Sequence, residues 1–122
     1  MIRTALEVGC LILALGRYNN IKFNYTKLAM VLYRANCFYA QATGQFLFEE
    51  KNRGDMNRPR YDSLMDAYGT CIASYITDTP KVTVTLDIMG IMAVRKAMEL
   101  KPYNPFDAMM MTMVNPDTAK YL

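Results

Sequence analysis

Apolar residues recur along most of the chain at intervals of three and four positions, the spacing that places them on one side of an α-helix. In the stretch 24–50 this pattern runs from Leu28 to Phe46 and predicts one long helix, with Gly44 as a weak point or bend. The same spacing predicts further helices over residues 3–17, 61–76 and 86–100, and a last helix that starts at Pro105 and ends before Pro116.

The connections between these helices are short and polar. Residues 51–60, "KNRGDMNRPR", hold four basic residues, a Gly and a Pro, which indicates an exposed loop. Residues 77–85, "TDTPKVTVT", predict a connection whose Val/Thr alternation could form a short strand, although no partner strand is evident. Thr85 is the expected N-cap of the helix 86–100, and Asn104 that of the last helix. We therefore expect a single all-α domain over residues 1–122, a bundle of about five helices with little or no sheet.

Composition narrows the classes of function. The 122 residues are 52% hydrophobic and include 11 Met and nine Tyr, side chains that suit helix packing and protein interfaces. So much apolar surface in a small bundle predicts a homo-oligomer. The net charge of +3 is too small to indicate a nucleic-acid partner.

Histidine is absent, which removes the commonest general base and most transition-metal sites. The three cysteines, Cys10, Cys37 and Cys71, are far apart and odd in number, so we expect buried thiols in a reducing compartment. The apolar stretch 8–16 is too short to span a bilayer, which needs about 20 residues. These features predict a cytoplasmic protein with no membrane partner.

Four carboxylates stand out as candidate metal ligands. Asp87 leads the helix 86–100 at the edge of its apolar face, and Asp107 follows an Asn-Pro-Phe step. Either acid is favourable at the positive end of its own helix, and either could be a corner of a site. Asp62 and Asp66 lie one helical turn apart, where they are either solvated or share a divalent cation. Mg²⁺ is the candidate cofactor.

Basic residues supply candidates for binding a phosphate group. Lys96 lies near the end of the helix 86–100, and Arg58 and Arg60 lie in the loop 51–60. Charge-assisted hydrogen bonds from these side chains could hold a nucleotide phosphate. A solvated loop is the alternative interpretation, and no catalytic residue can be assigned.

The C-terminal half resembles a known family through three stretches, "MDAYGTCIASYI", "DIMGIMAVRKAMEL" and "NPFDAMMM". It is similar to small phage-type nucleotide-modification-associated proteins related to MazG-like all-α nucleoside triphosphate pyrophosphohydrolases. The positions that match the family's pattern are Asp87, Lys96, Phe106 and Asp107. Catalytic members of the superfamily hold Mg²⁺ with Glu-x-x-Glu and Glu-x-x-Asp pairs, and neither spacing occurs in this chain.

Two functions follow from these observations. In the first, the chain is a small, phage-type, non-enzymatic helical interaction protein, an inhibitor of a host machine or an assembly component. Its Met/Tyr-rich apolar surface would then bind a host or viral protein. In the alternative, it is a MazG-like nucleotide-binding protein or Mg²⁺-dependent pyrophosphohydrolase, in which metal-assisted attack of water would cleave a phosphoanhydride. The sequence leaves open whether the protein is an enzyme.

Overall fold

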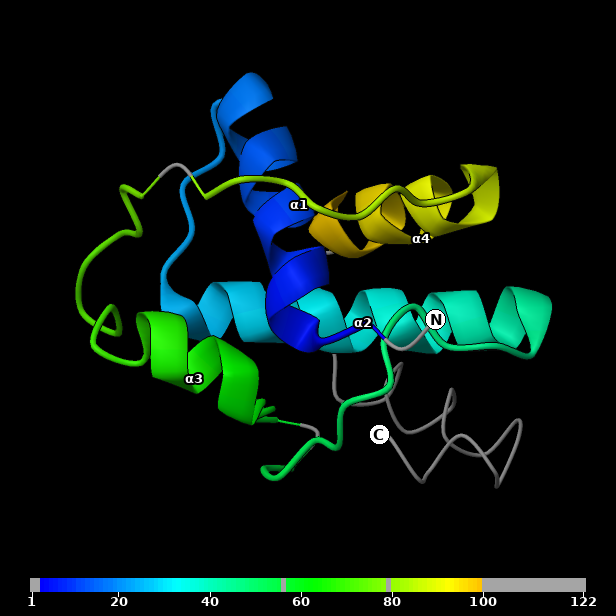
Figure 1. Ribbon diagram of the computed structural model, residues 1–122, viewed down its shortest axis with the longest axis horizontal. Coiled ribbons are helices and arrows are strands. Elements are labelled where there is room, and N and C mark those ends of the chain that lie inside the picture. The colour runs from blue at the N-terminus through cyan, green and yellow to red at the C-terminus, as the bar shows by residue number, and fades with distance from the viewer. Residues whose placement is uncertain (1–2, 56, 79, 100–122) are drawn as a thin grey trace.

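A computed structural model describes residues 3–55, 57–78 and 80–99, and Figure 1 shows how they are arranged. These ranges contain no strand and four helices, α1 (Ala5–Tyr18), α2 (Tyr25–Thr43), α3 (Asp62–Tyr68) and α4 (Ile88–Glu99). The predicted all-α class is therefore confirmed. The helix predicted after Asn104 lies outside the described residues.

The longest helix, α2, is the centre of the fold. In Figure 1 it runs beside α4, is crossed by α1, and has α3 on the side away from α4. The contact between α2 and α4 is the most extensive helix pairing. The side of α4 that is buried carries small residues one turn apart, which lets the two helices approach closely; they are Gly90, Ala93, Val94 and Ala97.

Local sequence explains where α1 and α2 begin. Thr4 and Glu7 form a reciprocal capping box at the start of α1. The Asn24 side chain accepts a hydrogen bond of 2.8 Å from the Lys27 amide at the start of α2. Near the end of α1, a Cβ at Gly16 would lie 2.5 Å from the Phe23 ring. Glycine at this position therefore allows the chain that connects α1 to α2 to pack directly on α1.

The end of α2 differs from the prediction. Helix was expected over 24–50, but Gly44 adopts a left-handed conformation, with φ of 75°, and ends the helix after Thr43. Residues after Gly44 then run back along α2 as irregular chain (Figure 1). The glycine that was expected to bend the helix terminates it.

Asn36, on α2, fixes this returning segment. Its side chain is fully buried, with its Oδ1 atom accepting from the amides of Leu47 (2.8 Å) and Phe48 (3.4 Å). Its Nδ2 atom donates to the Phe48 carbonyl at 3.3 Å. A single side chain thus supplies the polar partners that irregular backbone needs when it is buried.

The predicted helix 61–76 is also too long, because α3 ends at Tyr68. Beyond it, the carbonyl of Cys71 accepts from the Tyr25 amide at 2.9 Å, and that of Ile72 accepts from the Asn24 side chain. The Ile76 amide donates to the Phe23 carbonyl at 2.8 Å. The first of these bonds serves a free amide at the start of α2, and all three tie the segment after α3 to residues 23–25, which explains why this segment leaves the helix.

Several further expectations can be checked against the described residues. The described part of 77–85 is a connection and forms no strand. Cys10 and Cys37 are buried as predicted, whereas Cys71 is half-buried. Burial raises the pKa of the Cys37 thiol to about 12. No helix in the described ranges is long and apolar enough to cross a membrane.

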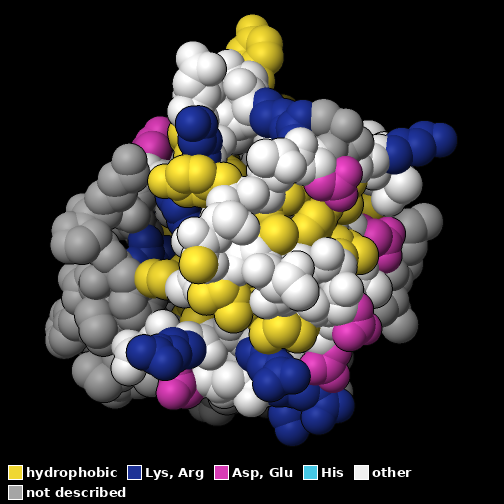
Figure 2. Space-filling view, turned by 90° about the vertical axis from the view of Figure 1, so that its left-hand side faces the viewer, with side chains coloured by type: hydrophobic (Ala, Val, Ile, Leu, Met, Phe, Trp, Pro, Cys, Tyr) yellow, Lys and Arg dark blue, Asp and Glu magenta, His cyan; other side chains and the backbone are white. Residues whose placement is uncertain are grey.

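Large apolar side chains also remain on the surface. Figure 2 views the molecule from the side on which the segments 19–24 and 69–78 lie in Figure 1, and hydrophobic side chains gather there between Lys and Arg. The exposed side chains include Ile72 and Tyr75 in the segment 69–78, and Tyr18 at the end of α1. A second group, on α4, consists of Ile88, Met89 and Met92.

Candidate functional site

Asp87 is the N-cap of α4. Its Oδ1 atom accepts a hydrogen bond of 2.7 Å from the Gly90 amide, three residues further on, and its carbonyl accepts from Ile91 at 3.0 Å. The cap was predicted at Thr85, so the prediction was wrong by two residues and α4 begins correspondingly late. The helix-start interpretation of Asp87 therefore has a specific geometric basis.

The second oxygen of Asp87 joins α4 to α2. The Tyr39 hydroxyl, from α2, donates to Asp87 Oδ2 at 2.9 Å. The pKa of the Tyr39 hydroxyl is raised above its usual value. The largest cause is partial desolvation, and the second is this hydrogen bond to Asp87. Both carboxylate oxygens thus have protein partners, so a metal would have to compete with them for Asp87.

The structure does not bring the predicted metal ligands together. Asp62 pairs with Arg53, whose Nε atom lies 2.7 Å from Asp62 Oδ2, and Asp66 is exposed one turn later on α3. In Figure 1, α3 and α4 lie on opposite sides of α2, which separates this pair from Asp87. Across the described ranges, no three His, Cys, Asp or Glu residues form a group that could hold a metal. Asp107 lies outside these ranges.

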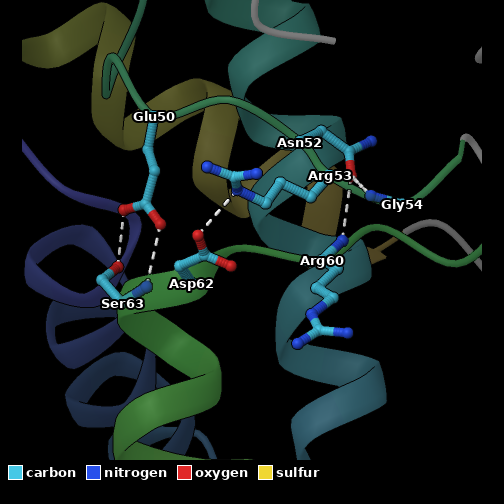
Figure 3. A network of polar contacts seen from close by, with 7 residues as sticks. All are labelled: Glu50, Asn52, Arg53, Gly54, Arg60, Asp62 and Ser63. Carbon is cyan, nitrogen blue, oxygen red and sulfur yellow. Dashed lines mark hydrogen bonds and ion pairs between the residues drawn. The ribbon is translucent and has the colours of Figure 1, made fainter.

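Glu50 connects two helix starts, and no sequence signal pointed to it (Figure 3). Its Oε1 atom accepts from the Ala5 amide of α1 at 3.0 Å and from the Ser63 hydroxyl at 2.6 Å. Its Oε2 atom accepts from the Ser63 amide of α3 at 2.9 Å, and the Ser63 hydroxyl accepts from Leu6. One carboxylate therefore lies at the positive ends of two helices, where negative charge is favourable.

Hydrogen bonds to the side chain of Asn52 hold the loop 51–60 in its conformation. Asn52 Oδ1 accepts from the amides of Gly54 and Arg60, each at 2.9 Å (Figure 3). A Cβ at Gly54 would lie 2.0 Å from the Arg58 carbonyl, so only glycine fits this turn. The side chains of Arg58 and Arg60 are exposed at its edge. Lys96 lies on α4, across α2 from this loop, so the three predicted phosphate ligands do not converge (Figure 1).

Lys96 instead belongs to an apolar surface on α4. Its Nζ atom lies 4.5 Å from the centre of the Phe38 ring, a cation–π contact between α4 and α2. Beside this contact is a hollow of about 410 Å³ lined by side chains of both helices, among them Phe38, Met89, Met92 and Lys96.

Three other apolar side chains of α4 are exposed to solvent. Ile88 is 78% exposed and Met92 is 58% exposed, and Met89 between them is also exposed. We call Ile88, Met89 and Met92 the outer face of α4. It adjoins the buried small residues, because Met89 and Met92 line the hollow between α4 and α2 together with Ala93, and its three side chains are exposed in the described part of the chain.

Comparisons with family models, with curated proteins and with solved structures each found no significant match to this chain. The resemblance to MazG-like proteins therefore stays a prediction. Among the residues that were missed, Asn36 and Tyr39 were hidden inside an apolar helix pattern, and Glu50 was read as part of a helix end. No spacing or motif in the sequence distinguished any of these three residues.

The first prediction concerns Glu50. Replacing it with Ala removes the acceptor for Ala5 and for Ser63, and should lower the free energy of unfolding by about 2 kcal/mol, the scale of hydrogen bonds to a charged group. Urea unfolding followed by circular dichroism measures this. Glu49→Ala is the matched control: the Glu49 side chain is exposed, and its removal should cost less than about 0.5 kcal/mol. Equal losses in both variants would contradict the bridging role.

The second prediction separates a cap from a metal ligand at Asp87. Asp87→Ala should lower the free energy of unfolding by about 1 kcal/mol, the usual scale for a lost cap, and Asp87→Asn should cost less because it keeps an acceptor. Millimolar Mg²⁺ should shift the melting temperature no more than NaCl of matched ionic strength. A Mg²⁺-dependent rise that disappears in Asp87→Asn would show that the carboxylate binds metal.

Proposed function

We propose that this protein is a small, non-enzymatic helical interaction protein that acts through the outer face of α4. The observation that carries the proposal is the exposure of Ile88, Met89 and Met92 on one helix. An exposed side chain of this kind gains about 1.5–3 kcal/mol when it is fully buried, so covering all three offsets several kcal/mol of the cost of association. Methionine adds adaptability, because its flexible side chain packs against differently shaped partners.

The hollow beside Met89 and Met92 gives this surface a shape as well as apolar character. It lies between α2 and α4 and is bounded on one side by Lys96. An amphipathic helix can lay its apolar side into such a groove. The partner we propose is a second copy of this chain, whose own α4 carries the same apolar residues and forms an isologous contact. Such an apolar surface would suit a phage protein that inhibits a host machine or takes part in assembly.

The alternative function, Mg²⁺-dependent cleavage of a nucleoside triphosphate, has less support from the described residues. It requires several carboxylates around one cation. Asp62 forms an ion pair with Arg53. The Asp87 carboxylate accepts hydrogen bonds from the Gly90 amide and the Tyr39 hydroxyl. We therefore place the interaction function first.

The third prediction tests the α4 contact directly. The wild-type protein should show a mass above that of one chain in light scattering, rising with concentration between 5 and about 100 μM. Met92→Glu should raise the dissociation constant at least about tenfold, because it places a charge in an apolar contact. The site is 58% exposed, so the fold should be retained.

Ile72→Glu is the control for this experiment. Ile72 is 56% exposed, almost the same as Met92, but lies in the segment after α3. It should associate as the wild type does. A wild-type protein that stays at the mass of one chain throughout, or a Met92→Glu variant that associates normally, would contradict the proposed interface.

A further inference from the structure

A groove near the end of α1 combines an apolar floor with two cations and an exposed aromatic side chain. It has a volume of about 400 Å³ and is formed by the last turn of α1, the turn that follows it, and the segment 75–77. Leu13, Phe23 and Ile76, all buried, contribute its apolar floor. Arg17, Lys22 and Tyr75 are exposed and line its rim. We call it the Tyr75 groove.

Each of the two cations contacts the segment that carries the aromatic ring. Lys22 Nζ lies 5.6 Å from the centre of the Tyr75 ring, which is 57% exposed. Arg17 Nη2 donates to the carbonyls of Thr77 and Asp78, which fixes its guanidinium against this segment and leaves its other N–H groups for a ligand. These contacts position a flat apolar surface beside two positive charges.

No carboxylate is among the residues that line this groove in the described part of the chain. The nearest acid along the chain, Asp78, accepts a hydrogen bond of 2.9 Å from the Tyr68 hydroxyl. Two other hollows have different charged groups: one pairs Arg95 with Glu99 in its lining, and the hollow beside α4 has a single cation, Lys96.

We infer that the Tyr75 groove binds a small aromatic phosphate of the size of a nucleoside monophosphate. The aromatic ring would lie on Tyr75 and the apolar floor, and the phosphate would contact Lys22 and Arg17. Ligand pockets commonly have volumes of about 300–1,000 Å³, so the groove accommodates one nucleotide. Binding needs no divalent cation, because the positive charge comes from the protein. The site shares no residue with the outer face of α4.

Isothermal titration calorimetry with adenosine 5′-monophosphate (AMP), in buffer containing EDTA, tests this inference. AMP should bind, and adenosine and inorganic phosphate should each bind at least about tenfold more weakly, because each lacks one half of the ligand. Tyr75→Ala and Lys22→Gln should each raise the dissociation constant for AMP about tenfold. Both residues are exposed, and circular dichroism verifies that the variants are folded.

Tyr18→Ala and Lys81→Gln are the matched controls, since both side chains are exposed and neither lines the groove. They should bind AMP within about twofold of the wild type. The inference is overturned if AMP does not bind at millimolar concentration, or if Tyr75→Ala and Lys22→Gln bind it as tightly as the controls do. Binding that requires Mg²⁺ would also overturn it, because a metal site would then hold the phosphate.

Discussion

The hydrogen bonds of Asn36 are the constraint on which the rest of this fold depends. A buried asparagine on α2 satisfies the backbone of Leu47 and Phe48, and therefore decides where the chain runs once α2 has ended. An apolar side chain at this position would leave these backbone groups unpaired, at a cost of about 1–3 kcal/mol for each buried group. The polar residue thus selects one path for a segment that has no secondary structure of its own.

The position of the returning segment has two consequences. It brings Glu50 to the starts of α1 and α3, so one carboxylate stabilises both helices and fixes their relative position. It also places Leu47 against the start of α4, where its side chain lies 3.2 Å from the position that a Cβ at Gly90 would take. The most extensive helix contact of α4 is with α2, the Tyr39 hydroxyl binds Asp87 at its start, and its outer face is exposed in the described part of the chain.

The sequence predicted the helices but not their ends. Periodicity located α1, α2, α3 and α4 because a buried helix face leaves a repeating pattern that needs no tertiary information. The ends were set by distant partners: Asn36 binds residues 11 and 12 positions later, and the Cys71 carbonyl serves Tyr25. Asp87 was interpreted as either a helix-start residue or a metal ligand, and its partner Tyr39 is 48 positions away in the sequence. The hydrophobic pattern also could not predict which apolar residues of α4 are covered, because apolar residues lie on more than one face of this helix.

The central claim is that the outer face of α4 is an interaction surface for a second copy of the chain. The most direct measurement is a dilution series of the protein labelled with ¹³C at the methionine methyl groups, followed by NMR. The resonances of Met89 and Met92 should move with concentration, whereas those of Met30 and Met65, half-buried on α2 and α3, should stay fixed. If all four resonances are independent of concentration, or if only Met30 and Met65 respond, then α4 does not form the contact.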